Sequence, residues 1–426
     1  MQNNPFYKFY QKSLDERKEI LFNHPTLTSK AKEQLNKGLA LPESIANQMV
    51  ENQIEIYGLP YGIVPELIVN GKSYIVPMVT EEPSVIAAAS YASKLINLAG
   101  GATTLQEKRE MIGEIAIIRS PLTLEEVKAK LEEQKESLFT IANNAHPSII
   151  KRGGGIREIW VEEKSTDKER FFIFYVSVDT KEAMGANMLN TILEALVSPI
   201  EAMTCGESIM AILSNLATNS VVTAKCVLSP RILDTRTTKG EDVIDRIVLA
   251  SEFSKADPYR ATTHNKGIMN GIDSVVIATG NDWRAIEAGA HAYASLSGQY
   301  QPLTNWTKDE AGNLVGTITL PLPVGTVGGS IAIHPGAQFA HELLGHPSAV
   351  ELAGIIASIG LAQNLAAVRA LVTDGIQKGH MRLQAKSLGL AVGATEDELP
   401  LLMNLLAKAP HLNQETAKAL LEKIRK

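Results

Sequence analysis

The residues best suited to chemistry gather in one stretch, Arg260 to Ala290, where charged side chains interrupt sequence that otherwise looks buried. Lys266 and Asp282 stand there among glycines and small residues that allow backbones to approach closely. A lone buried ammonium is very costly, so Lys266 needs a partner. The stretch by itself favours an ion pair in the core, and the alternative is a lysine kept for chemistry.

A second set of candidates, Glu81, Glu82 and Ser84, lies between an expected strand at 73–79 and an expected helix from residue 85. Pro83 suits the first turn of that helix. A carboxylate at such a junction ordinarily caps the helix. The alternative is a general acid or base held at the rim of a cleft.

Histidines offer two further candidates. The segment H-E-L-L-G-H resembles a zinc-protease helix, but its second histidine, His346, follows His341 by five residues instead of four. The two rings would lie about 140° apart around a helix, so we expect no metal site. His380, in K-G-H-M-R-L, opens a terminal helical segment joined through Gly375 and Gly379. It is either a solvated surface histidine or part of a mobile lid.

Glycine-rich segments give a weaker signal. No G-x-G-x-x-G fingerprint, Walker loop or G-x-S-x-G elbow is present. In A-M-G-A-N-M, however, Gly185 comes just before an expected helix, where backbone N–H groups can meet a phosphate. A plain helix start explains the same pattern.

Composition limits the class of protein. The 426 residues are 45% hydrophobic and 21% charged with a formal net charge of -6, so neither nucleic acid nor an anionic membrane is an expected partner. Two cysteines argue against a disulfide framework. The first ten residues lack the apolar core of a signal peptide, and the apolar run 350–372 is broken by polar residues, which indicates a buried helix. We expect a soluble, cytoplasmic protein.

The elements that position these candidates alternate between helices and strands. Polar helices over 8–55 precede a hairpin turning at Asn70-Gly71. After Gly100-Gly101 the expected strands and helices begin to alternate, which predicts an inserted α/β domain over 109–220. A large mixed α/β domain over 1–108 and 221–374 and a helical flap over 375–426 complete the predicted α+β and α/β multidomain fold.

Six motifs in order carry a resemblance: T-E-E-P-S-V-I-A-A-A-S, E-A-M-G-A-N-M, N-K-G-I-M-N-G, A-T-G-N-D-W-R-A, G-T-V-G-G and K-G-H-M-R-L. Together they closely resemble the 3-hydroxy-3-methylglutaryl-coenzyme A (HMG-CoA) reductase family in its soluble bacterial class II form. The likeness covers nearly the whole chain. It implies reduction of HMG-CoA to mevalonate and free CoA with two nicotinamide hydrides. It also implies a homodimer, or a higher oligomer, with active sites at the subunit interface.

The resemblance implies four catalytic residues: Glu82, with Glu81 as its neighbour, Lys266, Asp282 and His380. Lys266 would stabilise an oxyanion and Asp282 would keep Lys266 charged and in place. Glu82 would protonate the aldehyde oxygen, and His380 the leaving thiolate. The residues expected to hold the hydroxymethylglutaryl group are Ser84, Arg260, Asn270 and Gln363. No metal is required.

The large domain would bind acyl-CoA and dimerise, and the small domain would bind the nicotinamide cofactor. The residues expected at the cofactor are Asn144, Ala145, His146, Lys151, Arg152, Met184, Gly185, Asn187, Gly328 and Gly329. The loop at 142–152 has no acid, whereas His146, Lys151 and Arg152 could meet a 2′-phosphate. This favours NADPH as the cofactor, and NADH is the alternative. If the loop does not contact the cofactor, Lys151 and Arg152 are simply solvated loop charges.

Two departures from the family pattern stand out: Glu55 replaces the glycine of E-N-x-I-G, and Glu182 replaces the aspartate of D-A-M-G. The first puts local dimer packing in doubt and the second the fine geometry of the cofactor loop. The alternatives to HMG-CoA reduction are an acyl-CoA-binding protein without redox chemistry, a catabolic mevalonate-oxidising reductase, and a reductase of other thioesters or aldehydes.

Overall fold

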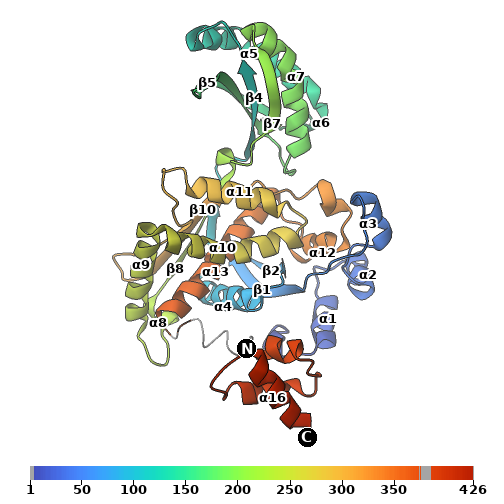
Figure 1. The fold of residues 1–426 in the computed structure, drawn as a ribbon, viewed down its shortest axis with the longest axis vertical. Coiled ribbons are helices and arrows are strands. Elements are labelled where there is room, and N and C mark those ends of the chain that lie inside the picture. The colour runs from blue at the N-terminus through green and yellow to red at the C-terminus, as the bar shows by residue number, and fades with distance from the viewer. Residues whose placement is uncertain (1–3, 374, 376–384, 426) are drawn as a thin grey trace.

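The computed structural model describes residues 4–373, 375 and 385–425. Figure 1 shows a small sheet-and-helix unit at one end, a large central unit, and the C-terminal helices at the other end near α1 (Leu14–Phe22). The mixed α/β fold class predicted from the sequence is confirmed.

The N-terminal segment is helical, as predicted. A short 3-10 turn, η1 (Phe9–Gln11), precedes α1, which Ser13 caps in a capping box with Glu16. Helices α2 (Ser29–Lys37) and α3 (Glu43–Met49) follow, and Pro42 is the N-cap of α3. Apolar residues of α1 and α2 pack with Phe339 and Leu343 of α12 (Pro335–Leu343) in a core of their own.

The expected hairpin consists of β1 (Tyr61–Val69) and β2 (Lys72–Val79), which pair antiparallel. Asn70 and Gly71 both have positive φ at its turn, which suits a type I′ geometry. Helix α4 (Val85–Leu98) follows β2 after five residues and packs on β1. The hairpin therefore carries the Glu82 junction on a rigid support.

The central unit has a four-stranded antiparallel sheet in the order β3-β8-β10-β9. Its strands are β3 (Thr103–Leu105), β8 (Val221–Leu228), β10 (Leu314–Pro321) and β9 (Thr304–Lys308). Its helical elements are α8 (Pro230–Leu233), α9 (Gly240–Ala256), α10 (Pro258–Ala278), α11 (Trp283–Ala294), η3 (Gly329–Ala332), α12 and α13 (Ala349–Val372).

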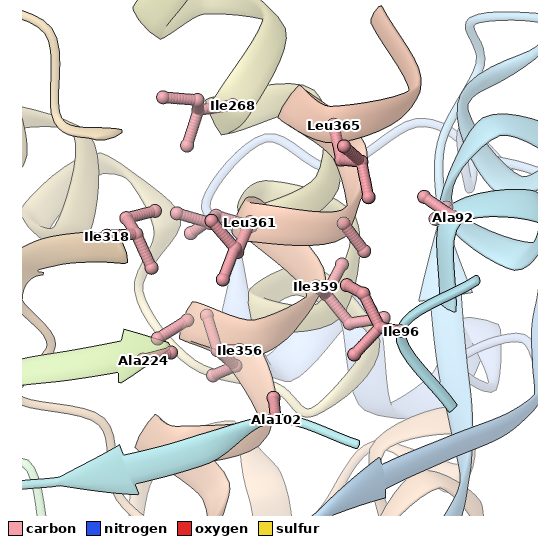
Figure 2. Close-up of a cluster of buried hydrophobic side chains, with 14 of the residues drawn as sticks. Ala92, Ile96, Ala102, Ala224, Ile268, Ile318, Ile356, Ile359, Leu361 and Leu365 are labelled. Carbon is pink, nitrogen blue, oxygen red and sulfur yellow. The ribbon is translucent and has the colours of Figure 1, made fainter. Parts of the chain in front are cut away.

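Helix α13 is the centre of this core. In Figure 2 its apolar side chains lie among residues of α4, α10 and the sheet: Ile356, Ile359, Leu361 and Leu365 beside Ile96, Ile268, Ala224 and Ile318. Within the described ranges α13 is the one helix long and apolar enough to cross a membrane, but most of that window is buried inside the protein. A helix that is apolar all round is typical of a protein interior, as predicted for 350–372.

The small unit has a second four-stranded sheet in the order β5-β6-β4-β7 and a separate core. Its elements are β4 (Glu110–Ile118), α5 (Leu124–Ala145), α6 (Pro147–Ile150), β5 (Gly155–Ser165), β6 (Arg170–Asp179), α7 (Ala186–Thr204), β7 (Glu207–Leu213) and η2 (Thr218–Ser220). Thr123 caps α5, and its side-chain oxygen accepts from the backbone N–H of Glu126.

At the C-terminus, α15 (Leu399–Leu406) and α16 (Gln414–Arg425) pack on each other around a fourth, local core. Arg425 Nε donates to Glu398 Oε1 at 2.8 Å and fastens the last helix to the start of α15. The segment K-G-H-M-R-L, with the candidate His380, lies outside the described residues.

Candidate active site

An ion pair joins the two segments that the sequence singled out. Lys266 Nζ lies 2.6 Å from Glu82 Oε2, across 184 residues of chain. Glu82 is placed by the bend between β2 and α4, where its backbone N–H donates to Thr80 Oγ1 at 3.2 Å. Lys266 stands in the middle of α10, which is continuous from Pro258 to Ala278. The structure thus brings together a carboxylate and an ammonium from different elements.

The burial expected for Lys266 is wrong within a single chain. The Lys266 side chain is 61% exposed and that of Glu82 is 38% exposed. Lys266 lies on the outward stripe of α10, so the helix does not need to compensate a buried charge. An exposed ion pair contributes little to stability, which leaves the pair available for chemistry.

Ser84 is held in an unusual state beside this pair. It is the N-cap of α4 with φ 80°, in the left-handed region that non-glycine residues rarely occupy. Its Oγ is buried and has no hydrogen-bond partner among the described residues. A strained backbone that holds an unpaired hydroxyl is typical of a ligand-binding position.

Gln363 provides a second unpaired polar atom. It lies on α13, 5% exposed, and its Oε1 is buried without a partner in the described part of the chain. A Cβ added to Gly271 of α10 would lie 2.9 Å from the Cβ of Gln363, so the two helices touch here. Asn270 precedes Gly271 and follows Lys266 by four residues, which places it on the same face as Lys266. Gln363 and Asn270 therefore lie at one crossing of α10 and α13.

Asp282 does not pair with Lys266, contrary to the expectation. It is the N-cap of α11, where its Oδ1 accepts from the N–H groups of Arg284 and Ala285 at 3.1 Å, and the Arg284 guanidinium lies at 3.5 Å. From Lys266, α10 continues for twelve residues to Ala278, roughly 18 Å along its axis, before the turn to Asp282. The uninterrupted helix therefore separates the two residues within one chain.

Arg260 is also set apart from the ion pair. It lies in the first turn of α10, six residues before Lys266, which corresponds to about 120° around the helix. Burial lowers the pKa of His264 to about 4, and the positive charge of Arg260 adds a smaller contribution in the same direction. No contact given by the described residues joins Arg260 to Glu82 or Lys266.

The two glycine-rich loops that carry candidate cofactor residues, around Gly185 and around Gly328, lie side by side. Gly185, φ 94°, is the N-cap of α7 and offers no side-chain cap, so the N–H groups of the first turn remain available to an anion. Met184 and Asn187 flank it. A bridge between Ala183 and Val327 joins this loop to the segment before Gly328 and Gly329, which both have positive φ. A glycine-lined path with free helix N–H groups fits a dinucleotide phosphate.

The basic candidates lie at the same end of the small sheet. Asn144 and Ala145 end α5, and His146, Lys151 and Arg152 flank α6. Lys151 and Arg152 have exposed side chains. Arg152 Nη2 donates to Ser148 Oγ at 3.2 Å, and this hydroxyl contacts His146 Nδ1 at 3.2 Å.

Sequence reasoning missed two cations in this region, Arg157 and Lys181. They lie 2.8 and 2.9 Å from the Asp179 carboxylate. Burial raises the pKa of Asp179, but hydrogen bonds from Lys181 and Arg157 outweigh burial and lower it. Asp179, the last residue of β6, pairs with Gly155, the first residue of β5. An acid at the end of this predicted strand, with cations close to both strand ends, was the feature of the sequence that could have revealed them.

A cavity of about 820 Å³ opens beside the candidate cofactor loops. Its lining includes Glu182, Thr326, Gly328, His341 and Glu351. His341 Nε2 lies 3.1 Å from the carbonyl oxygen of Thr279, and α12 ends at Leu343, before the second histidine of H-E-L-L-G-H. The helix that a zinc-protease motif needs is therefore not formed.

The family model described as hydroxymethylglutaryl-coenzyme A reductase matches residues 13–385. The chain belongs to this family. This match confirms the family that the six motifs resemble.

One relative and two solved structures illustrate this likeness. The HMG-CoA reductase of Archaeoglobus fulgidus is 41% identical over 98% of this chain and 94% of its own. A solved HMG-CoA reductase from Streptococcus pneumoniae is 51% identical, with a TM-score of 0.84 over 99% of this chain and all of that one. A structure of the class II HMG-CoA reductase from the same organism, bound to NADPH in open conformations, is 52% identical with a TM-score of 0.83, over 97% of this chain and all of that one.

Proposed function

We propose that this chain catalyses the four-electron reduction of HMG-CoA to mevalonate and free CoA with two molecules of NADPH. The observation that carries the proposal is the Glu82–Lys266 pair, 2.6 Å apart, together with unpaired buried oxygens on Ser84, two residues after Glu82, and on Gln363, where α13 meets α10. An acid, a cation and unsatisfied hydrogen-bonding groups match a reducible acyl group with a polar tail. Membership of the HMG-CoA reductase family supports the same reaction.

The proposed roles follow from charge. When bound, the nicotinamide supplies hydride to the thioester carbon and later to the aldehyde carbon. The Lys266 ammonium stabilises the negative oxygen that develops each time, and Glu82 donates a proton to the aldehyde oxygen in the second reduction. Between the two steps the carbon–sulfur bond breaks, and CoA leaves as a thiolate that must be protonated.

The substrate-holding set is Ser84, Asn270 and Gln363 around the pair, with Arg260 for the free carboxylate. A hydroxyl, two amides and a guanidinium suit the hydroxyl and carboxylate of the hydroxymethylglutaryl group. The unpaired atoms of Ser84 and Gln363 support this assignment, since buried polar atoms without partners are few in native proteins.

We place Asp282 in the site through a homodimer. Within one chain three helical turns separate it from Lys266, so a second copy supplies Asp282 to the Lys266 of the first. Co-expression of Lys266→Ala and Asp282→Ala chains tests this, because each mixed dimer would contain one intact site. Activity in the mixture, with neither variant active alone, is the expected result. An inactive mixture that still contains mixed dimers would contradict a shared site.

The C-terminal segment 375–426 is proposed as a flap that carries His380 to the leaving thiolate. Histidine titrates near neutral pH and can act as this acid. The helices α15 and α16 form a local core of their own, which supports a unit that moves as a body. The exposure of the Glu82–Lys266 pair also supports a cover, because electrostatic stabilisation is stronger in a site closed to water.

The remaining proposals assign cofactor binding, acyl-CoA binding and dimerisation to separate ranges of the chain. Residues 109–220 bind NADPH through the α7 N-terminus, with Lys151 and Arg152 at the 2′-phosphate. Residues 1–108 and 221–374 bind acyl-CoA and form the dimer. The protein is soluble and cytoplasmic under this proposal.

A spectrophotometric assay tests the proposed function. HMG-CoA should cause oxidation of NADPH, at two NADPH for each mevalonate formed, and faster than with NADH. Absence of oxidation with either cofactor, in protein that is folded and dimeric, would refute it. Oxidation with other thioesters but not with HMG-CoA would redirect it to another acyl-CoA reductase.

A further inference from the structure

The loop between β6 and α7, residues 180–185, is folded tightly on itself. Thr180 Oγ1 donates to the carbonyl oxygen of Ala183 at 2.8 Å. A Cβ on Gly185 would lie 2.3 Å from Cγ2 of Thr180, so only glycine fits there. The loop is therefore a preformed unit, whose position depends on what fastens it to its surroundings.

Arg109 is the first fastening. It lies in the crossing from β3 to β4 and donates to Thr180 Oγ1 and to the carbonyl oxygen of Ala183, both at 3.1 Å. Its guanidinium also donates to the carbonyl oxygen of Val324, in the large unit. Burial lowers the pKa of Arg109, while the charges of Glu182 and Asp179 raise it. One planar cation thus bridges the loop and the large unit.

Glu182 is the second fastening. Its Oε2 accepts from Thr326 Oγ1 at 2.9 Å and from the backbone N–H of Ala349 at 2.7 Å, and its backbone oxygen accepts from the N–H of Thr326 at 2.8 Å. Ala349 is the first residue of α13, where the helix dipole favours a carboxylate. The residue that departs from the family pattern therefore ties the loop to the helix that carries Gln363.

These fastenings continue to the start of α11. Gly325 N donates to Asn281 Oδ1 at 2.7 Å, and Asn281 Nδ2 donates to the Gly325 carbonyl at 3.0 Å. A Cβ on Gly325 would lie 2.6 Å from the backbone nitrogen of Met184. Gly325 therefore contacts Met184 on one side and Asn281 on the other. Asp282 follows Asn281 in the chain.

We propose that Arg109 and Glu182 are positioning residues that hold the cofactor loop 180–185 against the large unit, so that NADPH binding depends on both. The inference rests on the proposed function, because it needs the loop to bind the cofactor. Neither residue is required to touch NADPH. Each acts through the loop, whose position sets the direction of the first N–H groups of α7.

Binding of NADPH, measured at equilibrium through its fluorescence without substrate, tests the proposal. Glu182→Gln keeps the size of the side chain but removes its charge, which weakens both hydrogen bonds. We expect the Kd for NADPH to rise about tenfold, whereas the KM for HMG-CoA stays within about twofold of the wild type. Glu194→Gln, an exposed position further along α7, is the matched control and should leave the Kd unchanged.

Arg109→Lys gives an independent readout. Lysine keeps the charge but cannot present the planar set of donors that reaches three acceptors, so the Kd for NADPH should rise in this variant too. A wild-type Kd in folded Glu182→Gln protein would overturn the proposal. So would an equal rise of the NADPH Kd and the HMG-CoA KM, which would indicate general loosening. Wild-type protein that binds no NADPH would overturn the proposed function itself, and the inference with it.

Discussion

Replacing Ser84 by alanine should stabilise the protein and weaken substrate binding at the same time. The Ser84 Oγ is buried without a partner, and an unsatisfied buried polar group costs about 1–3 kcal/mol. Its removal should raise the free energy of unfolding by about 1 kcal/mol. The backbone strain at φ 80° remains in the alanine variant, so this gain comes from the hydroxyl alone.

The same hydroxyl has the opposite effect on substrate if it binds the hydroxymethylglutaryl group. A hydrogen bond to a charged group contributes about 1.5–3 kcal/mol, so the KM for HMG-CoA should rise roughly ten- to a hundredfold. Steady-state kinetics and calorimetric melting of one preparation measure both effects. Ser84→Gly should melt higher still, because glycine tolerates the positive φ.

Ser93→Ala is the matched control. Ser93 lies on the same helix α4, and its Oγ is also buried without a described partner. Its replacement should give a similar gain in stability with no change in the KM for HMG-CoA. A Ser84→Ala protein that melts lower than the wild type, or one that keeps the wild-type KM, would refute the reasoning.

Three further outcomes follow from charge and burial. Lys266→Ala should lower kcat/KM at least a hundredfold in steady-state assays, and full turnover would exclude the proposed role. The melting temperature should stay nearly unchanged, because the lysine side chain is exposed. Burial, together with the neighbouring Glu287, raises the pKa of Asp273 well above its usual range, so above roughly pH 4 the folded chain keeps a proton that the unfolded chain releases, and the stability of the fold falls as the pH rises. Asp273→Asn should flatten that slope in unfolding curves measured across pH. Burial raises the pKa of Cys226 to about 12, so a thiol reagent should titrate only the exposed Cys205 in native protein and both thiols after unfolding.

Features with a local cause could be predicted from the sequence. Asn70-Gly71 predicts the hairpin because both residues tolerate positive φ, and Ser13 with Glu16 predicts a capped helix. The apolar run 350–372 predicts the buried helix α13 because too little polar surface remains to face water. In each case neighbouring residues determine the outcome.

The geometry of the site depends on contacts between residues far apart in the sequence, and local sequence patterns do not predict such contacts. Glu82 and Lys266 are 184 residues apart, and no periodicity reveals that the bend before α4 meets the middle of α10. The expected Lys266–Asp282 pairing is absent within one chain because α10 runs without interruption from Lys266 to Ala278, although Gly267 and Gly271 lie inside it. Glycine costs only about 1 kcal/mol in a helix, and packing overrides it. At Gly271 the missing side chain instead lets α13 approach.

The two separate cores of the sheet-containing units have a consequence for synthesis on the ribosome. The core of the small unit uses residues from Met111 to Ala217, a continuous stretch that can assemble as soon as it has emerged. The large core joins residues as early as Val64 to residues as late as Val368. Its hairpin and α4 must therefore wait, with apolar faces uncovered, until α13 has been made. The first part of the chain to be translated is among the last to become buried.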